Sequence, residues 1–85
     1  MLSDHEPDYV RAEAHAAGHR EEIEKSRLCG CYHCLALFQP TAIDRWLSDV
    51  DAALCPECGT DAVIGDASGF GVNRDFLQLM QVYWF

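Results

Sequence analysis

The sequence has few basic residues and a strong excess of acidic ones. Six Lys and Arg stand against fourteen Asp and Glu, which gives a formal net charge of −8 at pH 7. Proteins that bind nucleic acid use Lys and Arg to displace counterions from the phosphates, and anionic membrane surfaces attract the same residues. The charge balance therefore disfavours nucleic acid and a membrane surface as partners.

Long apolar runs are also missing from the sequence. Residues 1–10 are acidic and polar and contain no apolar core of a secretory signal, and no stretch of about 20 apolar residues follows. We therefore expect a cytoplasmic protein without a membrane segment. Because thiols stay reduced in the cytoplasm, the five cysteines indicate a metal site rather than disulfides.

The chain is short for a protein that folds by apolar burial alone. A domain of 85 residues buries only about 60–65% of its unfolded surface. Structural zinc adds on the order of 10 kcal/mol of binding energy to the folding of small ribbons. We therefore expect one domain in which metal binding and folding are coupled.

Two Cys-x-x-Cys pairs have the spacing of a single metal site. Cys31 and Cys34 form the first pair, and Cys55 and Cys58 form the second, with residues 35–54 between them. In such sites each pair supplies two thiolates to one tetrahedral ion. Four thiolates close the coordination shell, so the pattern predicts a structural Zn2+ rather than a catalytic one. Iron is the alternative metal.

The turns that carry these pairs are named here the first knuckle (31–35) and the second knuckle (55–59). In the second knuckle Pro56 fixes φ beside the first cysteine, and Gly59 permits a positive φ after the last one. The first knuckle has Leu35 where a glycine is expected. The second knuckle is therefore the better suited to a tight turn.

One further cysteine and three histidines carry weaker signals. Cys29 is expected to be a small buried residue, with a reactive thiol or a fifth, exchangeable ligand as the alternative. His33 lies between two ligands and is expected at the surface or beside them. His15 and His19 are four residues apart and share a helix face, but Ala16 stands where a metalloprotease helix has glutamate, which disfavours a second metal site.

Residues 7–28 have the composition of a helix, with many Ala, Glu and Arg. Gly18 costs about 1 kcal/mol in a helix interior, so a break is expected there, with a second helix that begins near His19. The apolar stripe of this segment is weak and consists of Val10, Ala14, Ala17 and Leu28.

Short strands are predicted around the knuckles. The apolar residues 35–38 indicate one strand, and residues 52–54 and 62–64 indicate the two strands of a hairpin that holds the metal at its tip. Between residues 38 and 52, a capping-box pattern predicts a short helix over residues 41–48.

The C-terminal segment has the clearest periodicity. Asn73 offers an N-cap for a helix that begins at Arg74. At 100° per residue its large apolar residues span an arc of about 160°, and they are Phe76, Leu77, Leu79, Met80, Tyr83 and Trp84. Because this arc is wider than the roughly 100° of a core-facing stripe, we expect a protein partner or a homodimer contact near Tyr83 and Trp84. The alternative is that the N-terminal helices cover this face completely within one monomer.

These elements predict an α+β fold. A small zinc-ribbon or rubredoxin-like β-hairpin unit is expected between N-terminal and C-terminal helices. Within one domain, residues 1–28 form the N-terminal helical segment, residues 29–72 the zinc-ribbon unit, and residues 73–85 the C-terminal amphipathic helix.

The two knuckles and the closing helix together form a specific combination. It consists of Cys-Gly-Cys-Tyr-His-Cys at 29–34, a segment at 55–65 that begins Cys-Pro-Glu-Cys-Gly, and a helix with Phe76, Leu77 and Met80 ahead of a final Trp-Phe. Over residues 19–85 this combination resembles a family of small bacterial and phage-associated zinc-ribbon proteins, which are uncharacterised cytoplasmic proteins. The resemblance implies the fold and no activity. The knuckles are also similar to those of rubredoxin, an electron-transfer protein with iron on four cysteines.

The sequence therefore predicts a zinc-stabilised binding or adaptor protein that acts through protein contacts and is not an enzyme. One alternative is a redox module, either rubredoxin-like or based on the Cys29 thiol. The second alternative is a zinc ribbon that binds nucleic acid, which the charge disfavours.

Overall fold

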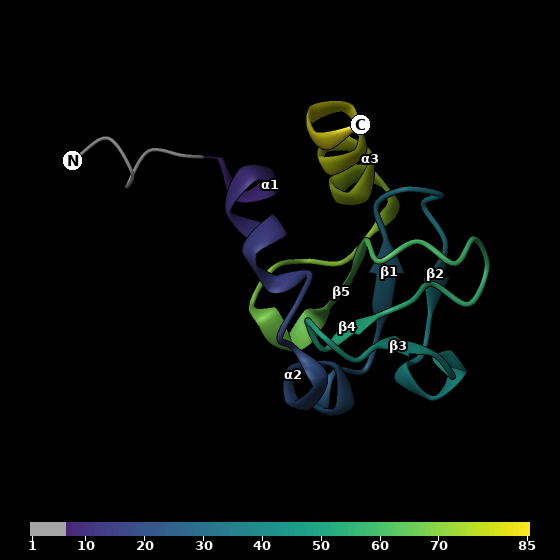
Figure 1. Ribbon diagram of the computed structural model, residues 1–85. Helices are drawn as coiled ribbons and strands as arrows, with labels where there is room; N and C mark the ends of the chain where they lie inside the picture. The colour runs from purple at the N-terminus through teal and green to yellow at the C-terminus, as the bar shows by residue number, and fades with distance from the viewer. Residues whose placement is uncertain (1–6) are drawn as a thin grey trace.

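The computed structural model describes residues 7–85. Residues 1–6 lie outside the described residues. They include His5 and most of the segment in which no signal sequence is expected. Within residues 7–85 the fold is α+β, as predicted, with three α-helices and two small antiparallel sheets (Figure 1). Across this part of the chain, each helix is too short or too polar to cross a membrane.

The larger sheet lies beside the metal site and has β1 as its middle strand. Its three antiparallel strands run in the order β2-β1-β5, and they are β2 (Leu37–Phe38), β1 (Cys29–Cys31) and β5 (Val63–Gly65). Cys29 pairs with Phe38 on one side and with Gly65 on the other. The smaller sheet joins β3 (Trp46–Leu47) to β4 (Ala52–Ala53).

Two predictions for the segments between and after the knuckles are wrong. The helix expected over 41–48 is a single 3-10 turn, η3 (Pro40–Ala42), after which Ile43 is extended and β3 begins. The hairpin of 52–54 with 62–64 does not form, because β4 pairs with β3 while β5 pairs with β1. Trp46 and Leu47 pair with Ala53 and Ala52 instead of continuing a helix, so strand pairing overrides the local capping pattern.

The N-terminal segment breaks at Gly18, as predicted. Its first half is α1 (Asp8–Arg11) followed by a 3-10 helix, η2 (Ala12–His15), and Gly18 has φ of 61° in the region that favours glycine. The second half is α2 (Arg20–Lys25), which ends short of residue 28. Figure 1 shows α1 beside α3 (Arg74–Trp84) and α2 at the opposite end of the molecule.

The buried face of this N-terminal segment differs from the predicted one. Ala14 and Ala17 are exposed, and Val10 and Leu28 are only half-buried. The buried residues follow a spacing of four, three, four and three along the chain and are Ala12, Ala16, His19, Ile23 and Ser26. Small alanine side chains let the segment approach the sheet closely, so this face depends on shape complementarity more than on apolar size.

His19 links the N-terminal segment to β4. Its side chain is only 3% exposed, and its Nε2 accepts the backbone N–H of Ala53 at 3.0 Å. The neutral ring therefore carries its proton on Nδ1, which donates to the carbonyl of His15. The ring also meets Trp46 edge-on, and the guanidinium of Arg20 lies 4.1 Å from the Trp46 ring centroid. This cluster fixes the strand that leads into the second knuckle.

The closing helix α3 packs directly on β1. The side chain of Asn73 caps it by accepting a first-turn backbone N–H at 2.8 Å, as predicted. Leu77 and Met80 on its inner face are fully buried. Gly30 makes the close approach possible, because a Cβ at this position would lie 2.6 Å from Leu77 Cδ1.

The connection between β5 and α3 contains one 3-10 turn, η4 (Asp66–Ser68). This turn is held against the end of α2. The Ser26 hydroxyl accepts the Ala67 N–H at 3.0 Å, and the Asp66 carboxylate accepts the Arg27 N–H at 2.9 Å.

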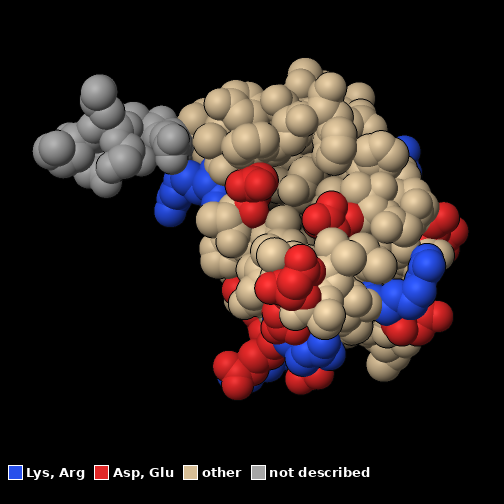
Figure 2. All heavy atoms as spheres, viewed as in Figure 1, with Lys and Arg blue, Asp and Glu red and all other residues tan. Residues whose placement is uncertain are grey.

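Charged side chains are unevenly spread over the surface. On the face shown in Figure 2, acidic groups gather over the lower part, whereas the upper part, over α3, carries few charges. Residues 76–85 contain no charged side chain at all. The end of α3 is therefore the least polar region of this face.

Replacing His19 with alanine is expected to lower the free energy of unfolding by about 2 kcal/mol, because the His15 carbonyl and the Ala53 N–H lose a buried partner. Burial lowers the pKa of His19 below 6.5, so the unfolded chain binds the proton first as the pH falls. The contribution of His19 is therefore complete above about pH 6.5 and is lost as the pH drops through its folded-state pKa.

Denaturant unfolding of the metal-loaded protein at several pH values measures both effects. His15→Ala is the matched control, and the loss of its half-exposed contact with Glu22 is expected to cost less than about 1 kcal/mol. A difference between wild type and His19→Ala that is the same at pH 5.5 and 7.5 would contradict the assigned role of a neutral His19.

Candidate metal centre

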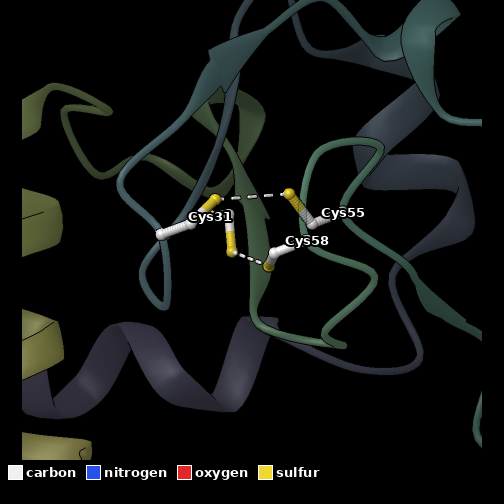
Figure 3. A group of neighbouring side chains, drawn as sticks. Cys31, Cys55 and Cys58 are labelled. Carbon is white, nitrogen blue, oxygen red and sulfur yellow. Dashed lines mark hydrogen bonds between the residues drawn. The ribbon is translucent and has the colours of Figure 1, made fainter.

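The four predicted ligands meet at one point between the knuckles. The Sγ atoms of Cys31 and Cys58 are 3.7 Å apart, those of Cys34 and Cys55 are 3.6 Å apart, and all four lie within 4.8 Å of one another. Figure 3 shows the sulfurs of Cys31, Cys55 and Cys58 turned toward a common centre. Thiolates at 2.3 Å from a tetrahedral ion are about 3.8 Å apart. The four cysteines are therefore positioned to bind one metal ion.

The two knuckles have the same hydrogen-bond pattern. The N–H groups of His33 and Glu57 each donate to the sulfur of the cysteine two residues earlier, both at 3.3 Å. The N–H group four residues after Cys31 and that after Cys55 each donate to the carbonyl of the cysteine, at 2.8 and 2.9 Å. The N–H groups of His33 and Glu57 stabilise negative charge on the buried sulfurs of Cys31 and Cys55.

Leu35 has the backbone conformation that Gly59 has in the second knuckle. Their φ angles are 66° and 79°, both in the left-handed region. This region costs a residue other than glycine about 1–2 kcal/mol. Contact of the Leu35 side chain with the core offsets part of that cost. The missing glycine therefore changes the energy of the first knuckle and leaves its shape intact.

The site has a buried half and an exposed half. Cys31 and Cys55 are buried, whereas Cys34 and Cys58 are exposed. Burial raises the pKa of the Cys31 thiol above its usual range. Burial also acts to raise the pKa of Cys58, but hydrogen bonds from Thr60 and His33 outweigh it and lower that pKa to about 6. Cys58 thus offers a thiolate at neutral pH, while a bound ion must displace the proton of Cys31.

The first knuckle is attached to the C-terminal end of α3. The Gln81 side chain donates to the backbone carbonyl of His33 at 2.9 Å. The ring of Phe85 lies edge-on to the His33 ring at 4.8 Å and 5.8 Å from the Tyr32 ring, measured between centroids. His33 is exposed and lies beside the ligands, as predicted. No feature of the sequence alone pointed to Gln81 or Thr60.

Cys29 and the two N-terminal histidines lie apart from the cluster. Cys29 is fully buried in β1, and burial raises its pKa to about 12, which favours the interpretation as a core residue over a reactive thiol or fifth ligand. His15 contacts Glu22 at 3.0 Å, and both ring nitrogens of His19 are occupied by hydrogen bonds. Within residues 7–85, the group with metal-ligand geometry is the four-cysteine cluster.

Comparisons of the chain with protein-family models, with curated protein sequences and with solved structures gave no match. Function is therefore inferred from the metal centre and from the surface that it supports.

Cys34→Ala or Cys55→Ala is expected to abolish metal binding and stable folding, because one lost thiolate removes much of the roughly 10 kcal/mol that the ion contributes. Cys29→Ala keeps all four ligands and is expected to cost only about 1 kcal/mol. Elemental analysis of protein purified without added metal measures the number of metal ions per chain and distinguishes zinc from iron. Loss of metal in Cys29→Ala together with its retention in Cys34→Ala would overturn the ligand set.

Removal of the ion by a chelator is expected to lower the far- and near-ultraviolet circular dichroism together, because the first knuckle and α3 share one core. An unchanged melting temperature after chelation would show that the ion is peripheral to folding.

Gln81→Ala tests the link between the first knuckle and α3 separately from metal binding, since it keeps the four ligands and loses only the contact with the His33 carbonyl. It is expected to lower the melting temperature of the loaded protein by about 4–8 °C.

Proposed function

We propose that the protein is a zinc-stabilised binding module of the zinc-ribbon type, which acts through protein contacts made by the end of α3. The observation that carries this proposal is the exposure of large apolar side chains on a helix anchored to the metal centre. Val82 is 76% exposed, Phe85 65% and Tyr83 55%, and Leu79 and Trp84 are also exposed. Leu79, Val82 and Tyr83 line one hollow and so adjoin one another, and an exposed apolar patch of this kind marks interaction sites in soluble proteins.

Zinc suits the donor set best. The four ligands are all thiolates, and they come from two turns with the same backbone geometry. Four thiolates close the shell of a tetrahedral ion and leave no position for a substrate, as in structural zinc sites. Iron accepts the same ligands, and it is the metal that a redox module would need.

The N-terminal segment covers only one flank of the closing helix. The Trp84 indole N–H donates to the Tyr9 carbonyl at 3.2 Å, and the rings of Tyr9 and Tyr83 meet at 5.7 Å. Despite these contacts, Tyr83 and Val82 remain more than half exposed. A protein partner that covers them would bury aromatic and aliphatic groups together, the composition of an interface core.

Photo-cross-linking in cells tests the proposal. A photoreactive amino acid at position 82 is expected to give a discrete protein adduct, and the same group at position 50, an exposed valine between β3 and β4, serves as the matched control. Equal cross-linking at both positions, or none at position 82, would contradict the proposal.

Sedimentation separates the two kinds of interface. If the partner is a different protein, purified wild type and the Tyr83→Ser, Trp84→Ser double variant are both expected to be monomers at high concentration. A wild-type dimer that the double variant dissociates would assign the same surface to a homodimer.

A further inference from the structure

A hollow lies between α1 and α3, on the exposed side of the closing helix. Its volume is about 540 Å³, within the range of about 300–1,000 Å³ that ligand sites occupy. It is lined by one residue of α1 and five of α3, which are Tyr9, Asp75, Gln78, Leu79, Val82 and Tyr83. α1 and α3 therefore form its walls. A groove of this kind can bind the apolar face of a helix from another protein.

The lining is apolar along most of α3 and polar at the start of the helix. Leu79, Val82 and Tyr83 supply the apolar part, and all three are at least half exposed. Asp75 and Gln78 lie one turn apart at the N-terminal end. The hollow thus offers an apolar floor with one carboxylate and one amide at one end.

The carboxylate in this hollow lacks a cation among the described residues. The ion pairs within residues 7–85 do not include Asp75. Arg74 is the sequence neighbour of Asp75, and it donates to the Leu35 carbonyl at 3.4 Å. Arg11 belongs to α1, the other wall of the hollow, and it contacts Asp8 at 3.3 Å. An occupant of the hollow that carries Lys or Arg would therefore supply the missing partner of Asp75.

We propose that this hollow binds an amphipathic helical segment of a basic protein partner, with its apolar side chains against Leu79 and Val82 and a Lys or Arg against Asp75. The proposal rests on the proposed function and specifies the chemistry of the partner. A second copy fits less well, because it brings another net charge of −8 and an α3 whose residues 76–85 contain no cation. Charge complementarity therefore favours a basic partner.

A designed peptide pair tests the chemistry of this site. One peptide is an amphipathic helix with leucine along one face and lysine beside it, and the other has glutamate in place of each lysine. The metal-loaded protein is expected to bind the lysine peptide at least tenfold more tightly, measured by calorimetry at physiological salt. Chemical-shift changes are expected at Leu79, Val82 and Tyr83.

Matched variants separate docking in the hollow from general attraction between opposite charges. Val82→Ser is expected to weaken binding of the lysine peptide about tenfold, and Asp75→Asn about fivefold. Val50→Ser and Asp49→Asn change the same residue types on an exposed turn between β3 and β4, and they are expected to bind like the wild type.

Equal losses in the control variants would overturn the proposal, because the binding would then follow net charge alone. Equal affinity for both peptides, or a wild-type dimer held through Val82, would overturn it as well. If position 82 cross-links to a protein while neither peptide binds, the partner chemistry is wrong and the proposed function stands. If there is neither a cross-link nor peptide binding, both are wrong.

Discussion

The convergence of four thiolates from two knuckles is the constraint on which this structure depends. The strands are only two or three residues long, and isolated strands of this length are not stable in water. The sulfur contacts run across the site, from Cys31 to Cys58 and from Cys34 to Cys55, so a bound ion ties the end of β1 to the loop between β4 and β5. The ion thereby takes the place of a larger apolar core.

This constraint extends from the site to the surface of the molecule. The first knuckle holds Gln81 and Phe85 at the end of α3, while Gly30 seats the middle of the helix on β1. On the other side, His19 holds the strand that enters the second knuckle. The second knuckle is therefore supported by the residue that precedes α2, and the helix that presents the exposed apolar side chains is positioned by the first knuckle beside it.

Local signals in the sequence predicted local features well. The Cys-x-x-Cys spacing identified the four clustered cysteines, Gly18 marked a helix break, and Asn73 marked a helix start. Local signals did not predict the strand pairing. β5 pairs with β1 and not with β4, and the paired residues lie more than thirty positions apart in the sequence. The helix predicted at 41–48 failed for a different reason, because Trp46 and Leu47 pair with Ala53 and Ala52 only five to seven positions further along the chain. The buried stripe of alanines and His19 was missed because these residues are neither large nor strongly apolar.

The left-handed backbone conformation of Leu35 makes the two knuckles energetically different. Gly59 adopts its φ angle without strain, so the second knuckle is the more easily formed in the absence of an ion. The knuckle that carries the backbone strain is therefore also the one that holds the C-terminal end of α3.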